Sequence, residues 1–386
     1  MGKMHYSKPY NKILISSLIS FFLNSSVRFF IPVLLPFLII SLNISVYAGS
    51  LLITSYWIGY TLFQMPSGII SDKYGIAKTN KISFIALTLI FTLLYFFKSS
   101  YYIIFIIQFF LGLFSSMVYI SDASLVQKWV PTRKRSTYVG IYQTGFFLGA
   151  SLGEFIILEA LSVSFYLPYL VIFILLLLTA IMNVMFIKNP EKVYKEYNKK
   201  ISTDIIYVAL IRFSAGFLYI GFLSLFTTFI IFDNIANYSN VYLYAFIPAV
   251  GGILTSPIGG YISTKLKKGK PVVSILSVLI LGLIIIYLGF SKPYYVFYLS
   301  FITGILYGLY AGPSMGMASD FSGDNKISSS SSILNFSSQI GGAISPFIIG
   351  FMFSIYNNFS YAFLLIGIIA LIAIIPAIIR LVIYTK

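Results

Sequence analysis

The chain has 386 residues, of which 59% are hydrophobic and only 9% are charged, and its formal net charge is +16. Soluble domains contain about 45–50% apolar and 25% charged residues, so this composition excludes an ordinary soluble fold and indicates a protein that lies in a bilayer. The absence of cysteine excludes disulfides and thiolate catalysis, and a single histidine, His5, argues against a histidine metal site. The basic residues occur in short clusters between apolar runs, which is typical of membrane topology rather than of a nucleic-acid surface.

Long apolar runs recur along the chain, each close to the roughly 20 residues that a membrane-spanning helix needs. The first run is too long for a signal-peptide core and lacks a small-residue cleavage site after it, so we expect it to be retained. The predicted fold class is an all-α integral membrane protein with twelve transmembrane helices. The expected spans cover residues 13–40, 46–70, 79–97, 101–124, 136–158, 164–187, 204–231, 240–262, 271–290, 293–318, 328–353 and 359–382.

The charges of the loops predict the orientation of these spans. If the N-terminus is cytoplasmic, nearly all of the 26 Lys and Arg residues fall in the tails and inner loops, and the outer loops keep only Lys98 and Lys292. Because cytoplasmic loops carry the excess of Lys and Arg, this asymmetry predicts that both termini are cytoplasmic. The expected location is the cell membrane.

A polar stretch at residues 188–203 divides the chain near its middle. We expect it to be a cytoplasmic linker between an N-terminal six-helix bundle (1–187) and a C-terminal one (204–386). An offset of 192 residues supports a duplication, because it aligns Gly68 with Gly260, Gly112 with Gly304, and Gly149 with Gly341. Parallel repeats of this kind place the substrate site at the repeat interface, near the middle of the membrane.

The loop after the second predicted span reads PSGIISDKYGIAK. Its first glycine is expected to allow close helix packing, and its second glycine a tight turn. The pattern resembles the signature loop of the major facilitator superfamily, which implies a loop that latches two halves in an outward-facing state. The second copy keeps the glycine and the bases but has Thr264 in place of the acid. The expected latch residues are Gly68, Asp72, Lys73, Gly75 and Lys78.

Other segments extend the resemblance over most of the chain: Gln64-Met-Pro66, Trp129-Val-Pro131 with Arg135, and the run from Gln339 to Pro346. Two positions depart from the patterns of this superfamily. Drug antiporters carry a proline in the fifth span where this chain has Ala150. Many members carry an arginine in the fourth span where it has Gln108. Both departures argue against drug/proton antiport.

Arg28 lies near the middle of the first span, where an ionisable side chain is costly and is a functional candidate. Ser20, Asn24 and Arg28 share one helix face at i, i+4 and i+8 spacing. The context of Val27-Arg28 with Pro36 resembles the first helix of the organic anion symporters and the organophosphate exchangers. The resemblance implies that the arginine meets a carboxylate or phosphate, for which its planar fork of donors is suited. Asn24 and Arg28 are therefore expected to bind substrate.

Arg212 lies in the seventh span with Tyr219 on the same face, and both are further candidates for substrate binding. Two such arginines resemble the clamp of the phosphate exchangers. The 192-residue offset places Arg212 opposite Ser20, however, about 12 Å by helical rise from the counterpart of Arg28. The alternative for Arg212 is an ion pair with an acid near the cytoplasmic face.

The fourth, tenth and eleventh spans also carry polar side chains. The resemblance implies that the first, fourth, seventh and tenth helices line a central cavity. On the eleventh, two amides lie one turn apart. Ser and Thr in these spans are expected to bond the backbone or allow close packing, and tyrosines have an interfacial location as their alternative. The candidates for substrate binding are Tyr119, Tyr307, Asn335 and Gln339.

Asp122 and Glu154 are the acids well inside predicted spans. Either is a candidate to carry a coupling proton if burial favours its neutral form. Asp122 lies near the cytoplasmic end, so a gating salt bridge is its alternative. Organic anion symporters usually carry an acid where this chain has Ser115, which argues against their style of coupling.

The predicted function is secondary active transport, by alternating access, of a small organic or phosphorylated anion with proton symport or exchange. The alternatives are a proton-coupled efflux antiporter and a non-transporting receptor with the same fold. We predict no enzyme activity, because no nucleophile–base or metal constellation occurs, and we expect that ATP does not drive transport, because no phosphate-binding glycine loop with a lysine occurs. No cofactor or metal is expected. The expected partners are the solute, protons and the lipid bilayer, with no nucleic acid and with the chain as a monomer.

Overall fold

The computed structural model describes residues 9–129, 135–189, 201–266, 268–321 and 327–383. The N-terminal tail with His5 and most of the predicted linker lie outside the described residues. Every regular element in the described ranges is a helix, as predicted. The first half contains α1 (Pro9–Leu42), α2 (Val46–Leu62), α3 (Gln64–Tyr74), α4 (Ile76–Phe97), α5 (Tyr101–Trp129), α6 (Arg135–Leu148), η2 (Gly149–Gly153), α7 (Glu154–Val163) and α8 (Leu167–Phe186). The second half contains α9 (Ile205–Ala215), η3 (Gly216–Ile220), α10 (Gly221–Phe232), η4 (Val241–Leu243), α11 (Ile247–Lys265), α12 (Gly269–Leu288), α13 (Pro293–Asp320), α14 (Ile327–Tyr356), α15 (Phe359–Ile378) and η6 (Ile379–Ile383).

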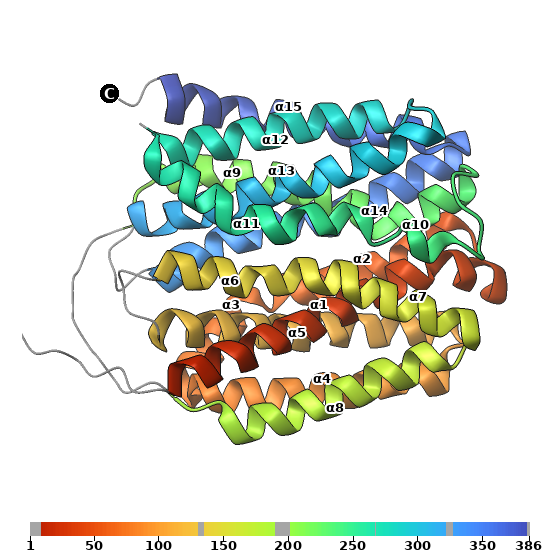
Figure 1. The fold of residues 1–386 in the computed structure, drawn as a ribbon, viewed down its shortest axis with the longest axis horizontal. Helices are drawn as coiled ribbons and strands as arrows, with labels where there is room; N and C mark the ends of the chain where they lie inside the picture. Colours follow the sequence, from red (N-terminus) through yellow and green to blue (C-terminus); the bar gives the residue numbers. More distant parts are fainter. Residues whose placement is uncertain (1–8, 130–134, 190–200, 267, 322–326, 384–386) are drawn as a thin grey trace, which may run out of the picture.

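Eleven helices in the described part of the chain are long and apolar enough to cross a membrane. The second predicted span is divided instead, because α2 ends at Leu62 after 17 residues and α3 begins at Gln64. Pro66 explains the break, since it has no N–H to donate to the carbonyl of Leu62, one helical turn earlier. The two pieces follow one another along the bundle, with α2 on the right of Figure 1 and α3 on the left.

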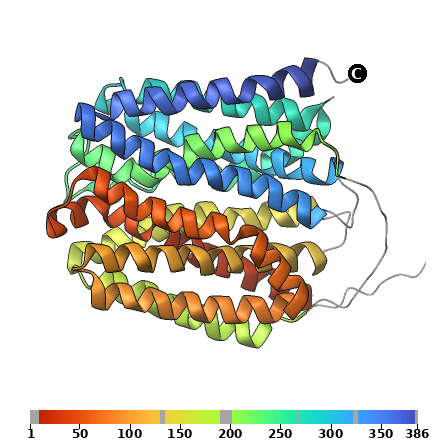
Figure 2. The same cartoon turned by 180° about the vertical axis from the view of Figure 1, so that it is seen from behind.

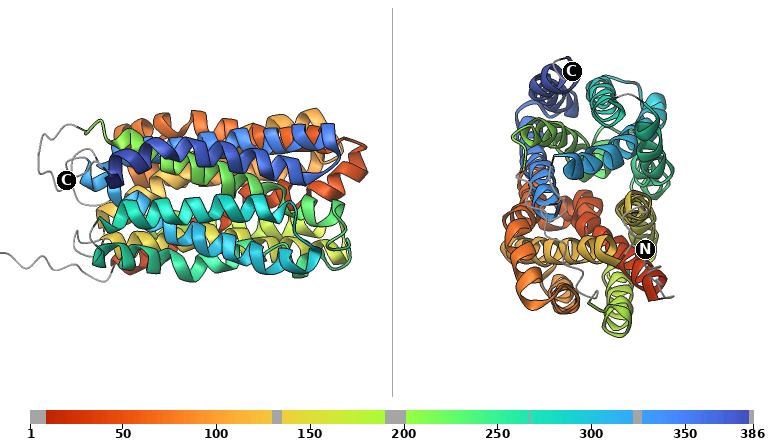
Figure 3. Two further views of the ribbon diagram at one scale, coloured as in Figure 1. Left: turned by 90° about the horizontal axis from the view of Figure 1, so that it is seen from above. Right: turned by 90° about the vertical axis from the view of Figure 1, so that its left-hand side faces the viewer.

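The helices form two groups, α1 to α8 and α9 to α15, whose axes run roughly along the long axis of the molecule (Figures 1 and 3). Helix α1 begins at the same end of the bundle at which η6 ends, and we call this the terminal end (Figure 1). The most extensive contacts between the groups are those of α2 with α14, α6 with α11, and α1 with α10. Figure 2 shows α2 beside α14 across this boundary. The boundary between the groups is therefore built from symmetry-related helices of both halves.

The helix crossings of the two halves repeat at the predicted 192-residue offset. A Cβ atom at Gly112 of α5 would strike the carbonyl of Tyr56 on α2, and one at Gly304 of α13 would strike the carbonyl of Pro248 on α11. Both residues of the second contact lie 192 positions after those of the first. Close backbone approach at small residues is the usual basis of helix packing in membranes. The duplication seen in the sequence thus corresponds to equivalent tertiary contacts.

The structure of the predicted latch loop matches the expectation at Gly75 and differs from it at Gly68. Gly75 has φ of +94°, which permits the turn between α3 and α4. Next to it, the amide of Ala77 donates to Oδ1 of Asn189 at 2.8 Å. The expectation of close packing at Gly68 is wrong, because a Cβ there would meet nothing within 4 Å. Lys73 and Lys78 are exposed, and the side chain of Asp72 lies outside the described part.

Candidate functional site

A central cavity lies between the two halves. Its volume is about 50 Å³, roughly the space of one or two water molecules in the liquid. A six-carbon solute is larger, so the cavity is contracted in this conformation. Its walls include Arg28, Tyr60, Tyr119, Gln143 and Phe146 of the first half and Arg212, Tyr307, Tyr310, Asn335 and Gln339 of the second.

Two other hollows are larger, at about 320 Å³ each. One lies around Phe297 between α10 and α13, and the other lies around Tyr95 between α4 and α8. Neither is lined by a charged side chain, whereas the central cavity is lined by two arginines. Ligand sites combine apolar walls with a few convergent polar groups, so the central cavity is the candidate site.

Arg28 is 3% exposed and is held on α1 within an aromatic cage. Its guanidinium carbon lies 5.1 Å from the ring of Trp57, 4.7 Å from that of Tyr60 and 5.5 Å from that of Phe146. The hydroxyls of Tyr56 and Tyr60 lie near the guanidinium, but its Nε and Nη2 atoms make no hydrogen bond of normal geometry, and no described carboxylate pairs with it. Buried charges are ordinarily paired, and buried donors are ordinarily satisfied. The site therefore presents unused donors and an uncompensated positive charge.

Arg212 is also buried, but its Nε and Nη1 already have protein partners. Its Nε donates to the carbonyl of Leu334 at 2.9 Å, and its Nη1 donates to Oγ of Ser314 at 3.0 Å. The alternative of an ion pair with an acid near the cytoplasmic face is wrong for the described residues, because both partners are neutral. Arg212 consequently adds a second positive charge to the cavity wall from the opposite half.

A chain of amides crosses between the halves beside these arginines. Asn335 of α14 donates its Nδ2 to Oε1 of Gln64 on α3 at 2.9 Å, and Gln339 donates its Nε2 to Oδ1 of Asn335 at 3.3 Å. The Nε2 of Gln64 and the Oε1 of Gln339 remain without partners. The chain therefore offers one donor and one acceptor near the cavity.

Several predicted residues line the cavity, and two do not. Arg28, Tyr119, Arg212, Tyr307, Asn335 and Gln339 are on its walls. Asn24 instead donates to the carbonyl of Ser115 at 3.0 Å within the α1–α5 interface, and it leaves its Oδ1 unpaired. The hydroxyl of Tyr219 donates to the carbonyl of Pro248 at 2.7 Å, and its ring stacks on Tyr307 at 4.1 Å. Asn24 and Tyr219 therefore support the wall from behind.

Other lining residues were absent from the predicted set. Gln143 of α6 donates its Nε2 to the hydroxyl of Tyr119 at 3.2 Å. Tyr60 and Phe146 cage Arg28. In sequence, these side chains resemble any other polar or aromatic residue of a span. A sequence signal exists for Gln64 of the neighbouring amide chain, which precedes Pro66 in a recognisable motif.

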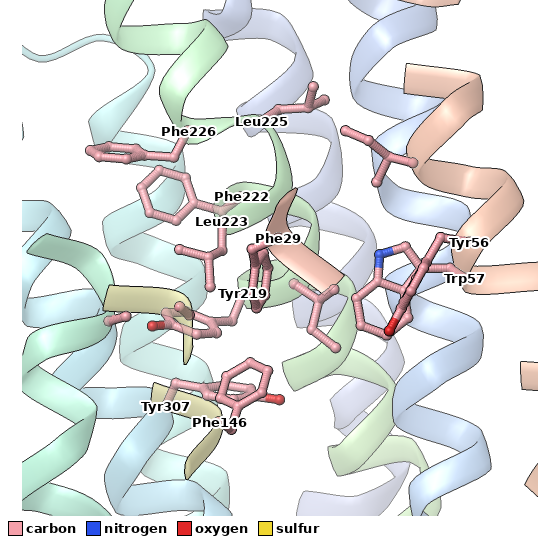
Figure 4. Close-up of a cluster of buried hydrophobic side chains, with 14 of the residues drawn as sticks. Phe29, Tyr56, Trp57, Phe146, Tyr219, Phe222, Leu223, Leu225, Phe226 and Tyr307 are labelled. Carbon is pink, nitrogen blue, oxygen red and sulfur yellow. The ribbon is translucent and has the colours of Figure 1, made fainter. Parts of the chain in front are cut away.

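Apolar side chains close the cavity on the side away from the terminal end. Figure 4 shows Phe222, Leu223 and Phe226 along α10, with Phe29 of α1 beside Leu223 and with Tyr219, Tyr307 and Phe146 below them. All these side chains except Phe146 and Tyr307 are no more than 3% exposed. Because this packing joins the two halves, a solute cannot pass until the helices separate.

The two predicted acids lie outside the cavity lining. Glu154, at the junction of η2 and α7, is 2% exposed, and its Oε1 has no partner. Asp122 of α5 is fully buried, and its Oδ1 accepts a hydrogen bond from Nδ2 of Asn80 at 2.9 Å. The alternative of a gating salt bridge at Asp122 is wrong within the described residues, because its partners are neutral.

Comparison with known proteins agrees with the architecture. The family model "Major Facilitator Superfamily" matches residues 17–346 and 273–386. The hexuronate transporter of Bacillus subtilis (strain 168) is 22% identical over 374 residues, which cover 88% of this chain and 86% of that protein.

Solved structures show the same fold. A bacterial homologue of the human lysosomal transporter Spinster, in an inward-facing and occupied conformation, superposes with a TM-score of 0.77 at 15% identity, over 96% of each chain. The same protein in an inward-facing and unoccupied conformation gives a TM-score of 0.75 at 14% identity, also over 96% of each chain.

Proposed function

The chain belongs to the Major Facilitator Superfamily, and on that premise we propose that it carries a small organic anion across a membrane by alternating access. The observation that carries this proposal is Arg28, a buried guanidinium with two unpartnered nitrogens on the wall of the cavity between the halves. A carboxylate or phosphate satisfies those donors and the charge together, and charge-assisted bonds of this kind are the stronger class of hydrogen bond.

The favoured substrate class is a sugar acid, as the similarity to a hexuronate transporter suggests. Its carboxylate binds Arg28. Its hydroxyl groups meet the donors and acceptors of Gln64, Gln143 and Gln339. The tyrosine rings of the cavity supply flat surfaces for the carbon skeleton. A phosphorylated anion is the alternative substrate class, because Arg212 offers a second positive charge.

Transport requires the halves to move, because the cavity is contracted and is closed by the α1–α10 packing. The proposed topology has twelve spans with both termini cytoplasmic, in a cell membrane. In it, α2 and α3 form one broken span, and the halves comprise residues 1–187 and 204–386. Coupling to a proton or to a counter-substrate is part of the proposal, with Glu154 as a candidate proton carrier. Export of a cationic compound is disfavoured, because two arginines line the cavity.

The test is thermal stabilisation of the purified protein by candidate solutes. We expect glucuronate or galacturonate to raise the melting temperature, glucose to leave it unchanged, and Arg28→Gln to abolish the rise. Uptake of labelled glucuronate into proteoliposomes measures transport itself. Stabilisation by cationic drugs alone, with none by carboxylates or phosphates, contradicts the proposal.

A further inference from the structure

A second polar cluster lies inside the first half, apart from the cavity. It centres on Asp122 of α5, whose Oδ1 accepts from Nδ2 of Asn80 on α4. The hydroxyls of Ser17 and Ser20 on α1 lie beside the same carboxyl group. Asn183 of α8 donates its Nδ2 to Oγ of Ser20 at 3.3 Å. Four helices thus bring their polar side chains to one point.

The cluster is fully buried and rich in unpartnered oxygen. Asp122, Asn80, Ser17, Ser20 and Asn183 are each 0% exposed. The Oδ2 of Asp122 and the Oδ1 atoms of both asparagines have no hydrogen-bond partner. The Nδ2 of Asn80 is already divided between Asp122 and Ser121. Buried polar atoms are usually satisfied, so this concentration of free acceptors calls for a positively charged occupant.

We propose that this cluster is a binding site for a single sodium ion. One carboxylate balances one positive charge, which favours a monovalent cation over a divalent one. Carboxylate, amide carbonyl and hydroxyl oxygens are the ligands that hard cations prefer. The three or more acidic, histidine or cysteine groups that would indicate a polyvalent metal do not occur together in the described chain. The ligands are Asp122 Oδ2, Asn80 Oδ1, Asn183 Oδ1 and the hydroxyls of Ser17 and Ser20.

The site is connected to the anion cavity through the same two helices. Helix α1 carries Ser20 and Arg28 on one face, about 12 Å apart by helical rise. Helix α5 carries Asp122 and the cavity residue Tyr119, whose ring lies 5.2 Å from that of Phe21 on α1. Bound sodium draws α1 and α5 together beneath the anion site. The resulting coupling of sodium to anion uptake rests on the proposed function, whereas sodium binding itself does not.

The experiment measures melting temperature without any organic anion, in NaCl and in KCl or N-methyl-D-glucamine chloride at equal ionic strength. We expect a saturable rise of about 2 °C when sodium is tenfold above its Kd, and no rise in the other salts. Asp122→Asn should abolish the rise, and Ser17→Ala should increase the half-maximal sodium concentration about tenfold. Glu154→Gln, which changes the other buried acid, should keep the sodium-dependent rise in melting temperature. Direct ²²Na⁺ binding to the same proteins reports the site independently.

Equal shifts in sodium and potassium overturn the proposal, as does a sodium shift that survives in Asp122→Asn. If Asp122→Asn does not fold, an unchanged sodium response in Ser17→Ala overturns it. The melting temperature could instead depend on pH and not on sodium, and Asp122→Asn could remove that pH dependence. This result assigns a proton to the carboxyl group and also overturns the sodium proposal. Because no anion is present, these results are separate from a failure of the anion-transport proposal.

Discussion

The two halves use the same helix contacts for opposite chemistry. Positions 20 and 122 of the first half correspond, at the 192-residue offset, to positions 212 and 314 of the second. In the first half, Ser20 lies beside the acid Asp122. In the second, Arg212 donates to Ser314 at 3.0 Å. One interface therefore pairs a hydroxyl with an acid, and its repeat pairs a hydroxyl with a base.

The residues around these two pairs also differ in polarity and charge. At the offset, Asn80 and Asn183 correspond to Val272 and Ile375, so the second half lacks the amide oxygens that surround Asp122. In the second half, the guanidinium itself supplies a positive charge, whereas the first half offers a carboxylate among free acceptors. The duplicated halves therefore keep the same close helix crossings, while their buried ionic groups have diverged.

The largest expected effect separates the two arginines. Arg28→Gln removes unused donors and should weaken binding of glucuronate at least about 100-fold, near 2.7 kcal/mol, as loss of a buried charge-assisted contact predicts. Arg212→Gln should cost roughly tenfold, because its donors already bond the protein. Titration of melting temperature against glucuronate measures both. A larger loss for Arg212→Gln reverses the assignment of the anion site.

Equivalent crossings should respond alike in the two halves. Gly112→Ala and Gly304→Ala each force a methyl group against a backbone carbonyl. Overpacking of this kind costs about 1–3 kcal/mol. Both variants should lower the melting temperature, whereas Gly68→Ala, which meets open space, should leave it unchanged and is the control. A neutral Gly304→Ala beside a destabilised Gly112→Ala contradicts the structural repeat.

A smaller effect is expected from the amide chain that joins the halves. Asn335→Ala removes the donor to Gln64, and a hydrogen bond of this kind contributes about 0.5–1.5 kcal/mol. The variant should lower the melting temperature slightly and loosen the contact between α3 and α14. Ser337→Ala, on the same helix with a bond only to its own backbone, is the matched control. Equal stability of the two variants contradicts a role for the amide chain.

The last prediction concerns the turn after α10, which differs from the equivalent turn of the first half in carrying an acid. Asp233 follows α10, whereas the turn after α1, residues 43–45, has no acid. Burial raises the pKa of Asp233 to about 6 from its ordinary value of 3.8. Because the folded protein holds this proton more tightly than the unfolded chain, stability should fall as pH rises from about 4 to 6. Asp233→Asn should remove that part of the dependence in melting curves at pH 5 and 7. If Asp233→Asn leaves the pH dependence of stability unchanged, the role of Asp233 is contradicted.

Much of the fold could be predicted, because a bilayer imposes simple requirements on length and hydropathy. The helical class, the bounds of most helices and the 192-residue duplication were all legible. The break at Phe63 was not, although Pro66 was visible, because hydropathy does not register the loss of one backbone hydrogen bond. The role of Gly68 was wrong for a related reason: a small residue indicates that close packing is possible, and only the neighbouring helix decides whether it occurs.

The sequence by itself determined which rare ionisable residues are buried, since Arg28, Asp122, Glu154 and Arg212 stand out in apolar spans at any position of the helices. Only the tertiary structure decided which of them are satisfied. Arg28 is left with free donors and Arg212 is not, because the partners of Arg212 are on α13 and α14, far away in the chain. Asp122 likewise meets the amide of Asn80 on α4 and the hydroxyls of Ser17 and Ser20 on α1. Hydropathy is local and can be read along one segment, whereas hydrogen-bond satisfaction depends on several segments that meet only after folding.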